Sequence, residues 1–501
     1  MVVLSAEQVH GWDNFTMDKE SIASIDLMER ASLRCVEWIE SSGLLNHQFA
    51  VYCGKGNNGG DGLAIGRLLH EKGCQVEIYI LEFGHLGTHD FQHNLQRLHT
   101  LPVNIHFLQP GTKLPDIPDE TIVVDALLGT GINRAADGLM AAIIQHINAS
   151  KNIVISIDLP SGMFCDLATI PNACINATVT LSFQCYKLAF LVAENASFFG
   201  RLFILDIGLA DEYLSSITPE YELMDIVIAS GIIRPRPPFA HKGNFGHALL
   251  FAGSEGKMGA AILAAKACLR TGAALLTCMV PQDGLAIIQT ALPESMAIVA
   301  SKTDASLPLP SLDMYTIIGA GPGIGIGESS AKHLHEILKA STIPMVIDAD
   351  ALNILSKNAE WLNLLQPFSI LTPHPKEFDR IAGLHDSDFA RIATARRLAK
   401  KYQLIIILKG HRTLIAMPGG RAWFNTSGNA SMAKGGSGDV LTGMITGLLS
   451  RGYAPEQAAL LGVYLHGLAG ELASDIHGVE SVLASDIVEN IGKAFQALEN
   501  K

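Results

Sequence analysis

The sequence has few charged residues and no basic block. Charged residues make up 17% of 501 residues, and the formal net charge is −13 at pH 7. Because lysines and arginines are scattered, nucleic acid and anionic membranes are poor candidates for partners. An anionic ligand would have to be bound by local backbone N–H groups and a few lysines, against the overall field of the protein.

The sequence also lacks paired cysteines, a leader and a long apolar run. None of its eight cysteines forms a Cys-x-x-Cys pair, and several lie in apolar stretches. This pattern indicates buried thiols in a reducing compartment rather than disulfides or a zinc site. No basic segment followed by an apolar one predicts a signal peptide, and no run of about 18 apolar residues predicts a membrane span. We therefore expect a cytoplasmic protein.

The length and the apolar content predict two or three α/β domains. Hydrophobic residues make up 48% of the chain, and 501 residues exceed what one core supports. Polar residues near 212–225 and the stiff RPRPP segment (234–238) suggest a domain boundary. We expect a Rossmann-like domain over residues 1–215 and a second α/β domain with a larger sheet over 222–501.

The first half alternates apolar strands with helical segments, which predicts a doubly wound parallel sheet. An amphipathic helix is expected over residues 21–40, and GKGNNGGDG (54–62) is expected as a glycine loop before a helix over 63–72. Strands are expected at Phe49–Cys53, Val76–Leu81, 121–125, 153–158, Val179–Phe183 and 202–207.

Three of these strands end in glycine-rich loops that carry polar side chains. Ligands of such sheets bind outside the carboxyl ends of the strands. One Asp at a strand end is usually a helix cap, but three such loops at one edge favour a binding site. Their oxygens could also hold a hard cation. The residues concerned are Asn57, Asn58, Asp61, Asp125, Asp158 and Ser161.

Three histidines offer a second candidate site. His85, His89 and His93 are four residues apart, so on one helix their imidazoles would share a face and could bind a metal. No carboxylate or cysteine stands at a suitable position among them, so a solvated helix face is the favoured interpretation.

The stretch SGNASMAKGGSGDVLTG (427–443) dominates the second half. Glycines 435, 436 and 438 expose backbone N–H groups, and the helix expected after them, over 440–449, directs its positive end at the same place. This arrangement is typical of phosphate sites, and Asp439 could act there as a base or simply be an N-cap. Other apolar β runs are expected within 241–254, 275–280, 316–325, 345–355, 369–378 and 404–416, with helices over 259–271 and 457–472.

Ordered motifs along nearly the whole chain resemble the bifunctional NAD(P)H-hydrate repair enzymes, which join an epimerase domain to an ADP- or ATP-dependent dehydratase domain with a ribokinase-like fold. The first half carries DLMERA (26–31), NNGGDG (57–62), VVDALLGTG (123–131) and IDLPSG (157–162). The second half carries HKGNFG (241–246), GPGIG (321–325), DADALN (348–353), LTPHPKE (371–377), LKGHRT (408–413), GNASMAKGGSGDVLTG (428–443), YLHGLAG (464–470) and LASDI (483–487).

The resemblance implies that the first domain interconverts the R and S forms of hydrated NADH and NADPH, with Asp158 as the acid–base group. It implies that potassium is bound by Asn58, Asp125 and Ser161. The implied substrate contacts are Asn57, Asn58, Gly59, Gly60, Asp61, Gly129, Thr130, Gly131, Ile132, Asn133, Arg134, Ala135 and Asp158.

For the second domain, the resemblance implies dehydration of the S hydrate through phosphoryl transfer from ADP, or ATP, with Mg²⁺. Asp439 would be the base, and the hydrate would contact Ala261, Gly323, His374 and Asp439. The implied nucleotide contacts are Lys409, Gly410, His411, Arg412, Thr413, Asn429, Ala430, Ser431, Met432, Ala433, Lys434, Gly435, Gly436, Ser437 and Gly438. The implied partners are these small molecules, and helices rich in small residues suggest a homo-oligomer.

Departures from the family pattern and two other functions remain open. Ala430 and Ser431 stand where the family has Pro-Gly, Lys376 where it has Gly, and Ala274 where it has Gly, which bears on rate and on the choice of donor. A small-molecule kinase, for a vitamin precursor or a sugar, fused to a Rossmann module would share the anion site and Asp439. The first domain could alternatively be a non-catalytic binding module.

Overall fold

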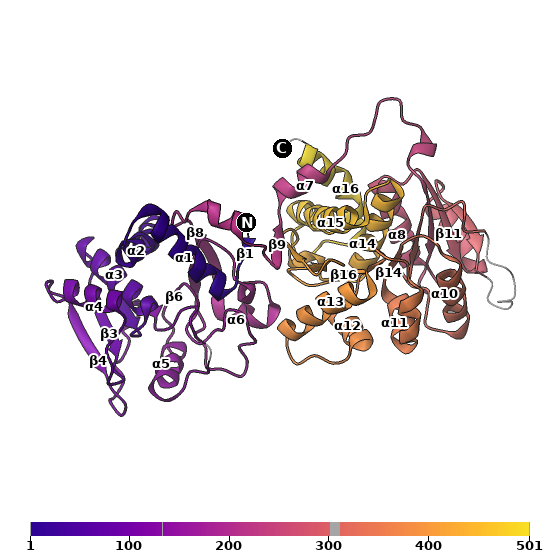
Figure 1. Cartoon of the computed structure of the whole chain (residues 1–501). Helices are drawn as coiled ribbons and strands as arrows, with labels where there is room; N and C mark the ends of the chain where they lie inside the picture. The colour runs from indigo at the N-terminus through magenta and orange to yellow at the C-terminus, as the bar shows by residue number, and fades with distance from the viewer. Residues whose placement is uncertain (1, 133, 301–310, 500–501) are drawn as a thin grey trace. The chain divides into compact units, whose positions relative to one another are not determined.

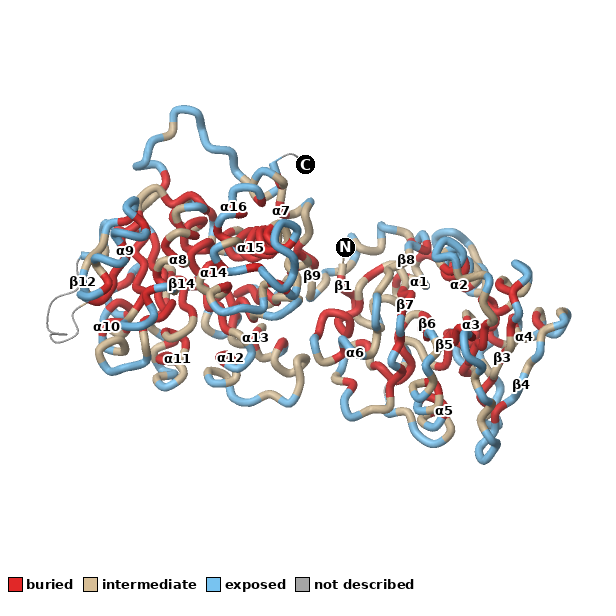
Figure 2. The backbone as a smooth tube through the Cα atoms, turned by 180° about the vertical axis from the view of Figure 1, so that it is seen from behind, coloured by how far each residue is buried: buried red, intermediate tan, exposed pale blue. Residues whose placement is uncertain are grey.

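The computed structural model describes residues 2–132, 134–300 and 311–499. The chain forms two compact units: unit 1 comprises Met1–Pro219 with Ser387–Phe389, and unit 2 comprises Glu220–Asp386 with Ala390–Lys501. Both units are α/β and contain parallel sheets, which confirms the expected fold class. In both, the strands are largely buried (Figure 2). All eight cysteines are buried and free, as their apolar surroundings predicted.

Unit 1 is built on a parallel sheet covered by helices on both faces (Figure 1). Along β2, Phe49, Val51 and Cys53 pack with one core while Ala50 and Tyr52 pack with the other, as expected for a strand buried on both sides. The strand order is β4 (Asn104–Leu108), β3 (Val76–Leu81), β2 (Phe49–Cys53), β5 (Ile122–Ala126), β6 (Val154–Ile157), β7 (Val179–Phe183) and β8 (Arg201–Leu205).

The helix α1 was missed by the sequence analysis. Its residues show no strong apolar stripe, yet Ser5 caps it and forms a reciprocal capping box with Gln8, a signal that was readable. The helices of unit 1 are α1 (Ala6–Glu20), α2 (Ser24–Ser41), α3 (Asn57–Glu71), α4 (His89–Leu98), α5 (Gly138–Ala149) and the short α6 (Ala196–Phe199).

The expected glycine loop over 54–62 is wrong in its extent, because α3 already begins at Asn57. The glycines permit close packing of this helix rather than a loop. A Cβ at Gly59 would lie 1.9 Å from the carbonyl oxygen of Gly54, and one at Gly62 would lie 2.5 Å from the Cβ of Ala126 on β5. The turn that ends at Gly56 and the first turns of α3, rather than a glycine loop over 54–62, are left to approach a ligand.

The sheet of unit 2 is larger and mostly parallel. From β16 to β12 all neighbours are parallel, whereas β17 is antiparallel to both of its neighbours. Three of the expected β runs are wrong in extent: residues 345–355 and 369–378 each hold a short strand followed by a helix start, and residues 404–416 form a hairpin. The order is β9 (Tyr221–Met224), β18 (Ala422–Asn425), β17 (Leu414–Ala416), β16 (Ile405–Leu408), β15 (Ile370–Leu371), β14 (Met345–Ile347), β13 (Ile317–Ala320), β10 (His247–Phe251), β11 (Leu275–Val280) and β12 (Met296–Val299).

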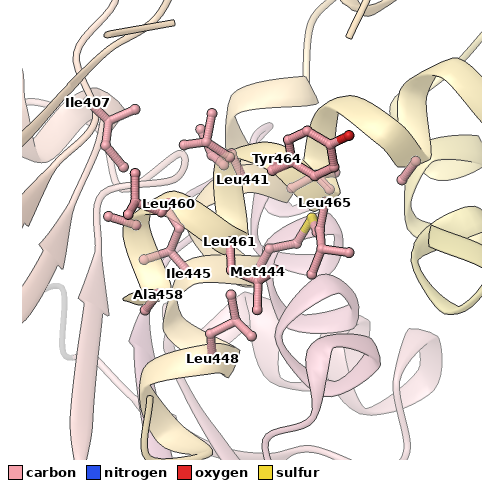
Figure 3. Close-up of a cluster of buried hydrophobic side chains, with 14 of the residues drawn as sticks. Ile407, Leu441, Met444, Ile445, Leu448, Ala458, Leu460, Leu461, Tyr464 and Leu465 are labelled. Atoms are coloured by element: carbon pink, nitrogen blue, oxygen red, sulfur yellow. The ribbon is translucent and has the colours of Figure 1, made fainter. Parts of the chain in front are cut away.

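Helices cover both faces of the sheet of unit 2. One face carries α8 (Met258–Thr271), α14 (Ser437–Ser450), α15 (Pro455–His477) and α16 (Ala484–Glu499), and the other carries α10 (Glu328–Ala340) and α11 (Ala349–Lys357). The remaining helices are α7 (Ile226–Ile232), α9 (Leu285–Ala291), α12 (Pro375–Ala382) and α13 (Asp388–Tyr402). Figure 3 shows α14 and α15 packed through Met444, Ile445, Leu448 and Leu461. The helix α14, which follows the glycine turn expected to bind a phosphate, is thus fixed in the core.

The small residues of α8 and α14 serve this internal packing. A Cβ at Gly443 would lie 2.0 Å from the carbonyl oxygen of Ala264, so the two helix backbones approach closely. These helices therefore give no support to the expected homo-oligomer, which stays a prediction.

Substituting Gly443 tests this packing. Gly443→Ala should destabilise unit 2 by roughly 1–3 kcal/mol, because the added methyl group meets backbone rather than a movable side chain. Gly492→Ala is the matched control, since α16 leaves open space around its Cβ position, and it should stabilise the chain by about 0.5–1 kcal/mol. Denaturant unfolding of both variants checks this, and equal stabilities would contradict the close approach of α8 and α14.

Candidate active sites

A large cavity lies in unit 1 at the reversal of its strand order. In the sheet, β3 and β4 lie on one side of β2, and β5 to β8 lie on its other side. The loops after β2 and β5 therefore diverge and leave a crevice. The cavity has a volume of about 1390 Å³. Of the expected substrate contacts, its lining includes Asn57, Asn58, Asp61, Gly129, Thr130, Gly131, Ile132, Arg134, Ala135 and Asp158.

Three expected contacts are placed differently. Gly59 and Gly60 do not line the cavity and instead lie buried inside α3. Asn133 lies outside the described residues. The first turn of α3 has no side-chain cap, so its N–H groups remain available to an anion at the cavity wall.

Asp158 forms an ion pair with a lysine that the sequence analysis did not identify. The Nζ atom of Lys187 lies 3.0 Å from Oδ1 of Asp158 and also donates to Ser182 Oγ and the carbonyl oxygen of Phe183. Burial lowers the pKa of Lys187, but the adjacent carboxylate of Asp158 outweighs burial and holds this pKa above its usual value. Asp158 has φ +65°, a left-handed conformation that is costly for most residues. Its position is therefore fixed by the fold.

The oxygens expected to bind a cation are close together and incompletely satisfied. Asp125 accepts hydrogen bonds from the backbone N–H and the hydroxyl of Ser161 and from the hydroxyl of Ser156. Burial raises the pKa of Asp125, and within the described residues no cationic side chain pairs with it. Asn58 donates to the carbonyl oxygen of Leu128, while its own Oδ1 is buried without a partner. A buried charge beside an orphaned acceptor suits a hard cation.

Additional carboxyl groups face the cavity besides Asp158. Burial and the charge of Asp158 raise the pKa of Asp13 to about 7, although Lys187 opposes this rise. Burial and the charges of Asp158 and Asp13 also raise the pKa of Asp61. Asp13 was missed because α1 itself was missed.

The three histidines do not form a metal site. His85 precedes α4, which begins at His89, so the three side chains do not share one helix face. Among the residues that the structure describes, no group of three or more His, Cys, Asp or Glu side chains is placed to hold a metal ion. The favoured solvated-face interpretation is consistent with the exposed ring of His89.

In unit 2 the glycine turn leads directly into α14. Gly436 has φ +94°, which favours glycine, and caps the helix without a side chain, so no side chain occupies the N–H groups that follow Ser437 in the first turn of α14. A Cβ at Gly438 would lie 3.2 Å from Nζ of Lys409, which places this ammonium on the first turn. Backbone N–H groups, a helix N-terminus and a lysine therefore converge at one place.

Asp439 is the third residue of α14, so the N-cap interpretation of this residue is wrong. Burial and then the charge of Asp348 raise the pKa of Asp439 to about 6, although Lys409 opposes this rise. Asp350 and Glu377 contribute in the same direction as Asp348. A carboxyl group in this state can accept a proton near neutral pH.

A buried aspartate that had no assigned role ties this site together. Asp348, at the end of β14, accepts hydrogen bonds from Lys409 Nζ at 2.8 Å and from Thr442 Oγ1 at 2.7 Å. It therefore links the ends of β14 and β16 to the second turn of α14. Only its position after an apolar strand, which it shares with many helix caps, signalled this in the sequence.

The expected hydrate contacts lie at the same edge, but two act structurally. Ala261 is fully buried in α8, and its Cβ would lie 3.1 Å from a Cβ at Gly253. His374 caps α12, with its ring Nδ1 accepting from the N–H groups of Lys376 and Glu377. Gly323, at φ +64°, accepts a hydrogen bond from Ser254 through its carbonyl oxygen.

The expected nucleotide contacts lie on two loops. In the β16–β17 hairpin, Thr413 Oγ1 donates to the carbonyl oxygen of Gly410, and Arg412 donates to that of Thr426. In the second loop, Asn429 Oδ1 accepts from the N–H and the hydroxyl of Ser431. Ser431 therefore closes a turn at the position where the family has glycine. The three residues from Ala433 to Gly435 are exposed.

The chain matches known families over both units. A family model described as NAD(P)H-hydrate dehydratase matches residues 248–493, and one described as YjeF-related protein N-terminus matches residues 24–189. The bifunctional NAD(P)H-hydrate repair enzyme of Moorella thermoacetica is 35% identical, with 100% of this chain and 98% of that protein covered. The enzyme of the same name from Escherichia coli is 30% identical, with 97% and 92% covered.

Two solved structures resemble unit 2. An ADP/ATP-dependent NAD(P)H-hydrate dehydratase from Bacillus subtilis, co-crystallised with ATP and Mg²⁺, has a TM-score of 0.50 and 33% identity, covering 56% of this chain and 99% of its own. A ribokinase-like superfamily protein from Enterococcus faecalis has a TM-score of 0.51 and 27% identity, covering 57% and 99%. Because the relative from Moorella thermoacetica is 35% identical over nearly its whole length, the chain belongs to the family of bifunctional NAD(P)H-hydrate repair enzymes.

Proposed function

We propose that the chain repairs hydrated NADH and NADPH in two steps. Unit 1 interconverts the R and S hydrates, and unit 2 converts the S hydrate to the reduced cofactor at the expense of ADP, giving AMP and phosphate. The observation that carries the proposal is that one chain holds both an acid-lined cavity at a sheet switch point and a helix N-terminus with Lys409 and Asp439. We expect this to occur in the cytoplasm.

In unit 1 the chemistry needs a proton donor and a proton acceptor near the hydroxyl-bearing carbon, C6, of the hydrated ring. Asp158 faces the cavity, and its ion pair with Lys187 keeps its carboxylate in one orientation. The open N–H groups of α3 and the loop around Gly129 are suited to the phosphates of the dinucleotide. Asp158 would thus exchange a proton with the C6 hydroxyl while the rest of the cofactor is held.

Potassium would be bound in unit 1 by Asn58, Asp125 and Ser161. When bound, it would supply positive charge beside an anionic cofactor and the buried Asp125. We expect epimerisation to fall when potassium is replaced by a bulky organic cation.

The control for this prediction removes the ligand rather than the ion. Asp125→Ala should lose the response to the salt, because the buried carboxylate that requires a counter-ion is gone. Circular dichroism of Asp125→Ala should match that of the parent and so show that the variant is folded. Equal epimerisation rates of the parent in both salts would remove the ion from the mechanism.

In unit 2 the open N–H groups of α14 and Lys409 would stabilise the transferring phosphoryl group, with Mg²⁺ neutralising charge on the nucleotide. Asp439 would take the proton of the hydrate hydroxyl as its oxygen attacks the β-phosphoryl group of ADP, which releases AMP. Departure of phosphate from C6, with loss of a proton from C5, then restores the ring double bond. Most of this catalysis is positioning, which Asp348 provides by holding Lys409 and Thr442.

The absorbance of the reduced nicotinamide tests the proposal. Protein, magnesium and a mixture of hydrated cofactor epimers should recover this absorbance when ADP or ATP is added, and should not recover it without a nucleotide. A product formed from a hydroxylated vitamin precursor and ATP, with no recovery from hydrated cofactor, would instead support a small-molecule kinase.

A further inference from the structure

The cavity of unit 1 has a second wall that its proposed chemistry has not used. Helix α1 presents one face to it: Ala6, Val9, His10, Asp13 and Met17 all line the cavity at helical spacing. Asp13 is the one carboxyl group on that face. Asp158 belongs to a different wall, because it follows β6 at the carboxyl edge of the sheet.

The position of Asp13 is fixed by its neighbours on α1. The indole N–H of Trp12 donates to the carbonyl oxygen of Ala210 at 2.8 Å, and Thr16 Oγ1 accepts from the backbone N–H of Ala210 at 3.0 Å. Trp12 is 2% exposed and packs with Leu27 in a small core. The helix cannot rotate without breaking these contacts, so Asp13 is held against the cavity.

In the part of the chain that the structure describes, the carboxyl group of Asp13 makes no hydrogen bond or ion pair that would stabilise the fold. Among the described residues no donor lies within hydrogen-bonding distance of it, whereas Asp158 has Lys187 and the N–H of Thr130. An unpaired, half-buried acid in a helix interior is costly unless it serves a function.

We propose that Asp13 is the second acid–base group of the epimerase and acts on the hydrated ring from the wall that α1 forms. This rests on the proposed function of unit 1. Inversion at C6 requires the hydroxyl to leave from one face of the ring and water to add to the other. Two carboxyl groups on different walls satisfy this requirement, and a single one does not.

The step balances without a further reactant. In the direction that supplies the dehydratase, the protonated carboxyl of Asp13 gives its proton to the C6 hydroxyl, the C6–O bond breaks with its electron pair on oxygen, and water leaves a C6=N1 iminium ion. Water then adds to C6 from the other face and gives a proton to the carboxylate of the second group. In the reverse direction the two groups exchange roles, as an epimerase requires.

The charges around Asp13 suit such a pair. Burial, and then the carboxylate of Asp158 in its ion pair with Lys187, raise the pKa of Asp13 to about 7. Asp61 on α3 adds negative charge from a third element, and Cys185 and His10 are neighbouring titratable groups. Two carboxyl groups in different environments at one cavity are typical of acid–base catalysis.

The test compares Asp13→Asn with Asp18→Asn in the full-length chain. Asp18 lies on the same helix but is exposed and does not line the cavity, so its substitution should leave both activities unchanged. With ADP, magnesium and mixed epimers, the first phase reports dehydration and the second reports epimerisation. Asp13→Asn should slow the second phase by about 10²–10⁴ and leave the first unchanged.

The pH profile separates this role from a structural one. The parent's second phase should decline above about pH 7, as Asp13 loses its proton, and the residual rate of Asp13→Asn should lack that decline. A variant that matches the parent in rate and profile would overturn the role of Asp13 while the epimerase assignment stands. A parent whose second phase is no faster than the spontaneous rate would overturn both.

Discussion

Replacing Asp439 with asparagine is expected to slow dehydration by about 10²–10⁴. The change keeps the shape of the side chain at the third position of α14 and removes the group that accepts the hydroxyl proton. The open N–H groups of α14 and the ion pair between Lys409 and Asp348 remain, so nucleotide affinity should stay close to that of the parent. Initial rates with the S hydrate, together with a binding titration of ADP, measure the two effects separately.

The pH dependence provides an independent check on Asp439. Its pKa is raised to about 6, and the base form is the active one, so the parent rate should fall as the pH drops through about 6. Asp475→Asn, at an exposed position of α15, is the control and should behave like the parent. An Asp439→Asn variant that keeps most of its activity would remove the role assigned to this residue.

Replacing Asp158 should slow epimerisation about as strongly as replacing Asp439 slows dehydration. Asparagine is the right substitute, because it tolerates the left-handed conformation at φ +65° better than alanine does. The first phase of hydrate repair should be unchanged and the second should fall to the spontaneous rate.

The buried partner of Asp158 requires its own control. Asp158→Asn leaves the fully buried Lys187 without a counter-ion, which can cost about 3–5 kcal/mol of stability. The double variant Asp158→Asn with Lys187→Met removes both charges and should recover most of that stability while staying inactive as an epimerase. Thermal unfolding and the second-phase rate measure this, and a double variant that epimerises like the parent would show that Asp158 is not the acid–base group.

The sequence predicted the sheets better than the sites. Strand β2 was predicted at its observed bounds, because its residues are buried on both faces, are continuously apolar and end in a glycine turn. The Gly436 turn and Asp439 were recognisable because phosphate binding requires open backbone. Lys187 and Asp13 were not recognisable, because each acts through Asp158, from which they are about 30 and 145 residues away in the sequence.

The extent of α3 could not be predicted for a related reason. Glycine is a poor helix former, so GNNGGDG predicted a loop. Its glycines are required by close contact with Gly54 and Ala126, which are brought against the helix only by the folded sheet. A tertiary contact thus outweighed a local preference, and it placed Asn58 in a helix rather than in a turn.

The most direct test of the two-step account is the time course of cofactor recovery from a mixture of the R and S hydrates, with excess ADP and magnesium. The full-length chain should restore all of the reduced-nicotinamide absorbance, with a second phase faster than spontaneous epimerisation. The chain carrying Asp158→Asn, and a fragment of residues 222–501, should stop after the fraction that one epimer represents and then proceed only at the spontaneous rate. If either of them went rapidly to completion, the division of the repair between an epimerase in unit 1 and a stereospecific dehydratase in unit 2 would be contradicted.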